Sequence, residues 1–405
     1  MSEQKDIDIK YNLRPFEDPP VTKIDVQALR LQSLDLSLFK DGDEFLEQRK
    51  ELANLLEKGI STSGFFNLVN FGIEPKQIER LRSIAQSILE LPESVQHKYL
   101  AGAIKKEDED PNVSIGAERA QGFKPKGYWP IKDGVRDSIV FYNFRDITKE
   151  NTEEEIKRHP EIIQEYFEEI GNYYKTLRNV VQPKLLRLCD LILQIPEGSL
   201  QKYFDSSENN EDRAGSRGRF MMYQPYENEN LAKQADSTFL RGHSDLGGFT
   251  YITSQPVLSL QIKDYFTGDW KYVDHVPGSL IVNVGDALEF ISGGLFKACI
   301  HRVVQPPLDQ RNSNRLVLIY FCSPNENSPL YPHDLNSPRL KELGLTKEDK
   351  LKDWEDIQFK HWNDIKGKVL GRRDAGTKNL LKFHGRSIER WHHIANDSAK
   401  STTSV

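Results

Sequence analysis

Short runs of strand-forming residues, separated by turn residues, fill the sequence from Arg219 to Cys322, and this pattern limits the fold more than any other feature. The runs occupy residues 219–223, 249–253, 258–262, 270–273, 279–284, 299–304 and 315–321. Closely spaced strands of this kind predict a β-sandwich or barrel rather than alternating β-α-β units.

Helical patterns precede this β-rich region. Apolar residues recur at helical spacing over residues 43–58, 75–91 and 163–192, and a short strand is expected at 63–70. Pro183 falls inside the longest pattern and should kink or split that helix. We therefore expect a mixed α+β protein in which the long helix covers a sheet.

The composition changes along the chain and suggests how it is organised. Residues 1–20 are polar and rich in proline, so we expect a flexible arm rather than a packed element. The polar stretch 205–218 is predicted to be a linker, and it joins residues 226–241 as a candidate lid. The expected segments are the arm (1–20), a helix-rich region (21–204), the linker or lid (205–218), the β-rich core (219–335) and a charged helical extension (336–405) with helices over 348–362 and 387–395.

Charge and cysteine usage exclude several classes of partner. The 405-residue chain has 55 Lys and Arg against 61 Asp and Glu, a net charge of −6, whereas nucleic-acid binding calls for a basic face. Cys189, Cys299 and Cys322 form no C-x-x-C pair, which indicates a reducing compartment and argues against a thiolate-rich metal site. The N-terminus lacks an apolar signal segment, and no run reaches the roughly 18 apolar residues of a membrane span. We therefore expect a cytoplasmic protein.

Two histidines and one aspartate in the β-rich region could bind a metal together. In extended chain, residues i and i+2 point the same way, so His243 and Asp245 can direct an imidazole and a carboxylate to one point. His301, on a later strand, can supply a third ligand. Two imidazoles and one carboxylate on one face of an octahedron form the facial triad of non-haem Fe(II) oxygenases, which leaves positions open for a co-substrate and O₂.

Other residues of similar appearance have plainer explanations. His159-Pro160-Glu161 repeats the spacing, but it falls where a helix is predicted to begin. The His392-His393 pair lies in a charged stretch without a carboxylate at ligand spacing. Asp286 is expected to support a turn after Gly285. Cys299, two residues before His301, should point to the same side of its strand as that histidine.

Arg315 begins the run RLVLIYF and has two interpretations that the spacing alone does not separate. Facing inward, its guanidinium would be a costly buried charge unless an anion met it, and a dicarboxylate co-substrate could provide that anion. Alternatively, it lies half exposed at the start of a strand.

Taken together, the motifs of the chain resemble those of the isopenicillin N synthase-like family of 2-oxoglutarate/Fe(II)-dependent dioxygenases, from about residue 20 to 335. The residues that carry the resemblance are SGFFNLVNFGI (63–73), GYWP (127–130), MYQP (222–225), GHSDLGGFT (242–250), LSLQI (258–262), VNVGDALEFISGG (282–294), ACIHRVV (298–304) and NRLVLIYFCSP (314–324).

The resemblance implies a double-stranded β-helix, or jelly roll, wrapped by N-terminal helices. It implies iron held by His243, Asp245 and His301, with Arg315 binding the distal carboxylate of 2-oxoglutarate and Tyr223 donating a hydrogen bond to the same co-substrate. The implied activity is oxidation, by default hydroxylation, of a small organic substrate with release of succinate and CO₂.

Two positions depart from the family pattern and keep other functions open. Val317 replaces the serine that usually follows Arg315 by two residues, and Met221 replaces an asparagine two residues before Tyr223. Each change removes a polar contact to the co-substrate, at about 0.5–1.5 kcal/mol for an ordinary hydrogen bond. The alternatives are a 2-oxoglutarate-independent Fe(II) oxidase of the isopenicillin N synthase type and a non-catalytic jelly-roll binding protein.

Overall fold

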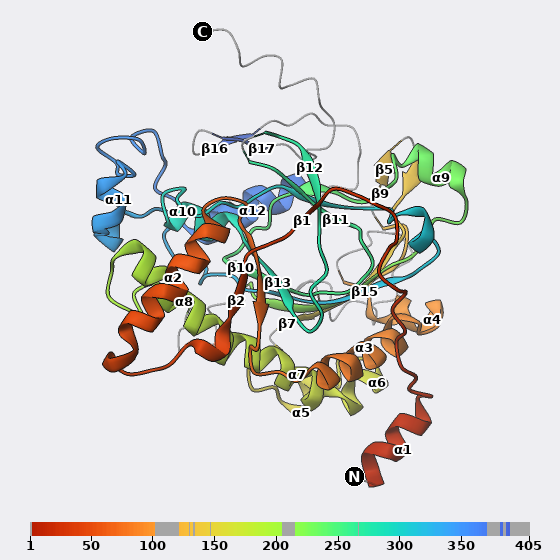
Figure 1. Cartoon of the computed structure of the whole chain (residues 1–405). Coiled ribbons are helices and arrows are strands. Elements are labelled where there is room, and N and C mark those ends of the chain that lie inside the picture. Colours follow the sequence, from red (N-terminus) through yellow and green to blue (C-terminus); the bar gives the residue numbers. More distant parts are fainter. Residues whose placement is uncertain are drawn as a thin grey trace.

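The computed structural model describes residues 2–101, 121–204, 215–370, 381–383 and 386–388, apart from residues 129, 133, 146 and 266. Two facing sheets form its centre (Figure 1). The larger sheet has the order β2 (Ser33–Asp35), β3 (Phe65–Val69), β13 (Leu280–Val284), β10 (Phe249–Thr253), β15 (Arg315–Phe321), β8 (Arg217–Tyr223), β7 (Ile139–Arg145) and β4 (Gly122–Lys124). The smaller sheet has the order β1 (Ala28–Leu29), β12 (Trp270–Val273), β11 (Leu260–Lys263), β14 (His301–Val304) and β9 (Thr238–His243). Two short strand pairs form separate sheets: β5 (Pro130–Lys132) with β6 (Val135–Arg136), and β16 (Leu381–Phe383) with β17 (Arg386–Ile388).

From β8 to β15 the chain passes repeatedly between the two sheets. Strands β8, β10, β13 and β15 belong to the larger sheet, while β9, β11, β12 and β14 belong to the smaller one. The pairings within this region are antiparallel, including β10 with β13 and β14 with β9. This is the topology of a jelly roll, so the predicted fold class is confirmed.

The region before residue 205 also contributes strands, which the sequence prediction missed in part. Strand β7 pairs with β8 along its whole length, from Ile139 opposite Tyr223 to Arg145 opposite Arg217. Its burial is nearly continuous, so the sequence shows no alternation of polar and apolar residues that would mark a strand. The expected boundary near residues 205–218 therefore cuts through one sheet, and Arg217 belongs to β8 rather than to a linker. Residues 205–214, expected as a lid, lie outside the described residues.

Helices cover the outer face of the larger sheet (Figure 1). They include α2 (Leu46–Ile60), α3 (Pro75–Leu89), α4 (Glu93–Gln96), α5 (Glu153–Ile156), α6 (Glu161–Glu165), α7 (Phe167–Thr176) and α8 (Gln182–Leu193). The remaining helices are α1 (Ser2–Lys10), α9 (Glu229–Gln234), α10 (Asp286–Ile291), α11 (Pro338–Glu342) and α12 (Phe359–Leu370). Among the described residues, no helix has both the length and the apolar character needed to cross a membrane.

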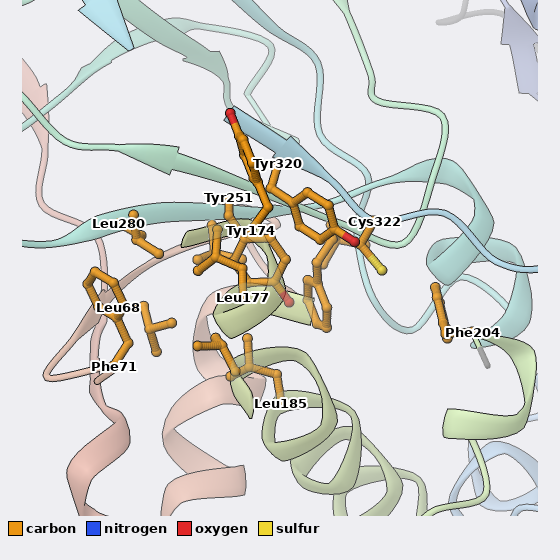
Figure 2. Packing of buried hydrophobic residues seen from close by; sticks show 14 of the residues in the cluster. Leu68, Phe71, Tyr174, Leu177, Leu185, Phe204, Tyr251, Leu280, Tyr320 and Cys322 are labelled. Atoms are coloured by element: carbon orange, nitrogen blue, oxygen red, sulfur yellow. The ribbon is translucent and has the colours of Figure 1, made fainter. Parts of the chain in front are cut away.

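The core lies between these helices and the sheet. Figure 2 shows Tyr251 and Tyr320 of the sheet facing Leu177 and Leu185 of the helical layer, and all four side chains are buried. The long predicted helix is divided as expected, because a π-helical turn at Leu177–Val181 precedes Pro183 in the first turn of α8.

The N-terminal segment is packed, contrary to the expected arm. Residues 2–10 form helix α1, and the Asp8 carboxylate binds the Arg80 guanidinium of α3 at 2.9 Å. Further along, Asp18 forms an ion pair with Arg82 of the same helix. The polar composition of residues 1–20 suggested that these carboxylates are exposed to solvent. Instead, Asp8 and Asp18 each form an ion pair with an arginine of α3.

The C-terminal extension also differs from its prediction. Residues 348–358 are turns and irregular chain, and the helix begins only at Phe359. The aromatic side chains of α12 carry the packing, since Phe359 and Trp362 are both buried. Most of the second predicted helix, over 387–395, lies outside the described residues, as do His392 and His393.

His159, which repeats the metal-ligand spacing, is a buried structural residue. Its ring is 3% exposed and stacks on Phe144, with 6.1 Å between ring centroids. A neutral imidazole can donate from Nδ1 to the Tyr142 hydroxyl at 2.7 Å and accept at Nε2 from Gln121 at 3.3 Å. Burial lowers the pKa of His159 from 6.5 to about 4.

This lowered pKa predicts a loss of stability in mild acid. Between about pH 6.5 and pH 4 the unfolded chain takes up a proton at His159 that the folded chain does not, so the free energy of unfolding should fall by up to about 3 kcal/mol as the pH drops. Chemical denaturation of the wild type and of His159→Gln across this range should show a smaller fall in the variant. Parallel curves for the two proteins would contradict the assignment.

Candidate metal centre and substrate cavity

Three predicted ligands converge at the open end of the smaller sheet. His243 is the last residue of β9 and His301 the first of β14, and the two lie opposite each other in the strand register. Asp245 Oδ1 is 3.6 Å from Nε2 of His243 and 3.8 Å from Nε2 of His301. One ligand atom from each of the three residues lies within 4.8 Å of the others, a separation suited to one divalent cation.

Each of the three predicted ligands forms a hydrogen bond through the atom that does not face the other two, and these bonds orient the side chains. His243 Nδ1 lies 2.8 Å from the Arg241 carbonyl oxygen, and His301 Nδ1 lies 3.2 Å from that of Cys299. We assign the proton of each ring to Nδ1 on this basis, which leaves Nε2 as a free lone pair. Asn283 donates to Asp245 Oδ2 at 2.8 Å, so Oδ1 remains for a metal. The donor set and its orientation therefore fit an iron ion.

The electrostatics keep Asp245 and His243 in the protonation states that a metal requires. Burial alone would raise the pKa of Asp245, but the two imidazoles and hydrogen bonds from Asn283 and Thr250 outweigh it and hold this pKa well below its usual value. Burial lowers the pKa of His243 to about 4, and the neighbouring His301 adds to the effect. The carboxylate is therefore ionised and His243 neutral at physiological pH.

The loop that follows the ligands is held by backbone contacts. Asp286 N–H donates to the Asp245 carbonyl at 2.8 Å, and Gly248 N–H donates to that of Cys322 at 2.7 Å. Gly247 is required by the same close approach, because a Cβ at this position would lie 2.4 Å from the Cys322 carbonyl oxygen. The Gly247-Gly248 pair thus lets the loop pack directly on the end of β15.

A buried lysine from the C-terminal extension also holds the loop. Lys366 of α12 donates to the carbonyl oxygen of Ser244 at 2.7 Å and to its hydroxyl at 3.0 Å. The same ammonium forms an ion pair with the Asp286 carboxylate, and both side chains are almost completely buried. Asp286 therefore does more than support a turn, since it fixes the cation that contacts the residue between His243 and Asp245.

The ligands open into a cavity of ≈ 400 Å³ between the two sheets. Arg315 and Tyr223 lie opposite each other on β15 and β8, line this cavity and are 5% and 3% exposed. The guanidinium carbon of Arg315 is 5.0 Å from the centre of the Tyr223 ring. Burial lowers the pKa of Arg315, whose Nε has no hydrogen-bond partner among the described residues. Arg315 thus faces inward, which is the interpretation that requires an anion.

The structure also gives the positions of the other residues that the sequence analysis named. Met221 and Val317 line the cavity beside Tyr223 and Arg315 and offer no hydrogen bond there. Cys299 is not among the residues that line the cavity, and its Sγ contacts the Thr62 carbonyl oxygen at 3.8 Å. The candidate lid at 226–241 contains α9 and most of β9, so much of it is regular structure.

The sequence analysis missed several residues of the site. Asn283 could have been noticed as a polar residue within the apolar run SLIVNV. Arg219 and Arg217 could have been noticed because they lie four and six residues before Tyr223, on the same face of a strand. Lys366 gave no signal, because its partners are far away in the sequence.

Comparison with known proteins identifies the family. Residues 201–324 match the model of the 2OG-Fe(II) oxygenase superfamily, and residues 31–162 match that of the non-haem dioxygenase in morphine synthesis N-terminal region. The chain is 25% identical to jasmonate-induced oxygenase 4 of Arabidopsis thaliana over 291 residues, which cover 70% of this chain and 71% of that protein. It is 26% identical to 1-aminocyclopropane-1-carboxylate oxidase 1 of Cucumis melo over 309 residues, covering 75% and 82%.

Solved structures show the same fold. A full-length protein of Neurospora crassa in complex with alpha-KG superimposes with a TM-score of 0.65 at 18% identity, covering 85% of this chain and 98% of that one. JOX2 in complex with 2OG, Fe and JA superimposes with a TM-score of 0.61 at 20% identity, covering 89% and 92%.

The chain belongs to the 2OG-Fe(II) oxygenase superfamily. It is an oxidoreductase of the 2OG-Fe(II) dioxygenase type, a class defined by the use of Fe(II), 2-oxoglutarate and O₂ on small organic substrates, as the sequence predicted.

The contact of Lys366 with the ligand loop can be tested by substitution. In Lys366→Met the buried Asp286 carboxylate loses its cation, so the free energy of unfolding should fall by about 3–5 kcal/mol. Loss of the bonds to Ser244 should also weaken anaerobic Fe(II) binding by about tenfold, as substitutions behind metal ligands do.

Lys360→Met provides a matched control, because Lys360 is an exposed residue of the same helix whose Nζ binds Asn327 Oδ1 at 2.9 Å. It should change neither quantity. Equal iron affinity in the wild type and Lys366→Met, measured where both are folded, would show that α12 does not support the metal centre.

Proposed function

We propose that His243, Asp245 and His301 bind the Fe(II) ion and that Arg315 and Tyr223 hold the distal carboxylate of 2-oxoglutarate. The single observation that carries this assignment is the shared cavity, which all five side chains line. With the iron in place, the metal supplies the O₂ activation that drives oxidation, by default hydroxylation, of the small organic substrate. Succinate and CO₂ leave as co-products.

The protein's own side chains would position the metal and make part of the cavity wall apolar. The two imidazoles and the carboxylate would hold the metal where they line the cavity, which would leave room there for the co-substrate and the substrate. Apolar side chains form part of the wall of the cavity that the ligands share with Arg315, and they favour the exclusion of water from it. Those that line the cavity include Met221, Ile252, Leu260, Val303, Val317 and Ile319.

We further propose that the chain belongs with the isopenicillin N synthase-like enzymes of the superfamily and acts in the cytoplasm. The sequence motifs support the first assignment. The second is supported by the three cysteines, which are all buried and form no disulfide among the described residues.

A second candidate function is oxidation without 2-oxoglutarate, in which the substrate itself provides the electrons. The observation that favours it is the apolar character of Val317 and Met221, which flank Arg315 and Tyr223 and contribute no hydrogen bond to a carboxylate. Arg315 alone would then carry the charge recognition.

The metal assignment predicts the effect of removing a ligand. His243→Ala or Asp245→Ala should abolish iron-dependent turnover while the fold persists, because two ligands hold the metal weakly. Anaerobic addition of Fe(II) and then 2-oxoglutarate to the wild type should produce a weak visible metal-to-ligand charge-transfer band. Turnover that survives either substitution would refute the ligand set, and iron binding without the band would favour the second function.

The co-substrate assignment predicts opposite effects at two positions. Arg315→Gln should raise the KM for 2-oxoglutarate by roughly 10- to 100-fold, since a charge-assisted hydrogen bond is lost. Val317→Ser should lower this KM by roughly 2- to 10-fold, because a hydroxyl is added beside Arg315. Succinate release measures both.

Val303→Ser serves as the control for Val317→Ser, since it introduces the same hydroxyl elsewhere on the cavity wall, on β14. It should not lower the KM. A KM that is unaffected by Arg315→Gln would place the co-substrate elsewhere.

A further inference from the structure

We propose that Arg217 and Arg219 bind an oxyanion group, a carboxylate or a phosphate, of the substrate that is oxidised, which is therefore a small organic anion. The inference rests on the proposed function and specifies its substrate class. Both arginines belong to β8 and line the same cavity as the metal ligands. Because they are two residues apart in a strand, their side chains leave on the same face.

A co-substrate held at Arg315 and Tyr223, as proposed above, is not the anion that these arginines bind. Arg217 lies six residues from Tyr223 on the same strand, which corresponds to about 20 Å. Tyr223 lies opposite Arg315 in the register, whereas Arg217 lies opposite Phe321 at the other end of β15. The cavity thus has positive side chains at both ends of one strand, and a single 2-oxoglutarate does not reach both.

Protein carboxylates do not neutralise this pair within the described part of the chain. Neither arginine takes part in an ion pair there, and Arg217 Nε has no hydrogen-bond partner. Arg219 donates its Nε to Asn143 Oδ1 at 2.7 Å, which leaves its two terminal nitrogens for a ligand. Burial, reinforced by the charge of Arg217, lowers the pKa of Arg219 to about 9. An anion between the two would offset both effects.

Aromatic rings hold the guanidinium planes in place. The Arg219 guanidinium lies 4.1 Å from the centre of the Phe141 ring and 4.9 Å from that of Phe321, and Arg217 lies 5.3 Å from the latter. Such stacking fixes the orientation of an arginine without using its hydrogen-bond donors. The pair is therefore preorganised for bidentate contacts with an oxyanion.

The pair also lies close to the reaction centre. Arg217 lies opposite Phe321 on β15, and Phe321 in turn lies opposite Thr250 on β10. The Thr250 side chain hydrogen-bonds the Asp245 carboxylate. The Asp245 charge acts on both arginines, although it is too far away to form an ion pair with either. A substrate anchored by its anionic group on β8 would thus present its apolar body to the metal, along the walls formed by Ile252 and Ile319.

The test measures the binding of three probes with one apolar body. The full-length protein is loaded anaerobically with Fe(II) and saturating 2-oxoglutarate and titrated calorimetrically with 3-phenylpropanoate, 2-phenylethyl phosphate and the uncharged 3-phenylpropanamide. At least one anion should bind about tenfold or more tightly than the amide, and comparison of the two anions identifies the preferred oxyanion. Equal affinity for the amide and both anions would overturn the proposal.

Substitutions assign the binding to the pair. Arg217→Gln and Arg219→Gln should each weaken binding of the preferred anion by about tenfold and leave binding of the amide unchanged. Arg302→Gln is the matched control. Arg302 likewise donates Nε to a neighbouring side-chain amide, Gln261 at 2.8 Å, and stacks on Trp270 at 4.1 Å, but it does not line the cavity. It should leave all affinities unchanged. An equal loss in all three variants would mean that net charge, not this pair, attracts the anion.

Failure of the inference differs from failure of the proposed function. The charge-transfer band and succinate release of the wild type without probe report the function alone. An anion that displaces 2-oxoglutarate, seen as loss of that band, would bind at Arg315 and contradict the inference. If 2-oxoglutarate fails to bind at all, the same probe titrations on the metal-free protein still decide whether Arg217 and Arg219 form an anion site.

Discussion

The structure depends on the buried Asp245 carboxylate, which would be costly without a hydrogen-bond donor. Asn283 donates to it on one side and His243 and His301 flank it on the other, so three strands and a loop must meet at one point. The glycine pair after Asp245 exists because this loop approaches the end of β15 so closely. A metal ion at the proposed site would meet donor atoms that hydrogen bonds to Arg241, Cys299 and Asn283 already orient.

Sequence patterns could predict those site residues whose relative positions follow from the alternation of side chains along a β-strand. The spacing of His243 and Asp245 on one face follows from the two-residue period of a β-strand, whereas the direction of Arg315 stayed open because that period does not say which face is buried. Strand β7 was missed because burial on both faces removes the period altogether. Lys366 and Asp18 could not be predicted, since each forms an ion pair with a residue distant in the sequence, and no local pattern marks such a partner.

Segments outside the β-rich core are part of the functional unit. Strand β7 supplies Asn143 and Phe141, which position Arg219, and helix α12 supplies Lys366 and two residues of the cavity wall, Phe359 and Asn363. The boundaries suggested by composition therefore separate residues that work together. The jelly roll holds the ligands, and the flanking segments determine how rigidly these are held and what lies beside them.

Strand β8 has a consequence for the outcome of catalysis. It carries Tyr223 near one end and Arg217 at the other, on a backbone hydrogen-bonded to neighbours on both sides. In the proposed binding mode the co-substrate is fixed at one end and the acid group of the substrate at the other, so the strand sets the distance between the two. The carbon that meets the metal is then chosen by its distance along the substrate from the acid group, so that regioselectivity becomes a matter of chain length rather than of intrinsic C–H bond strength.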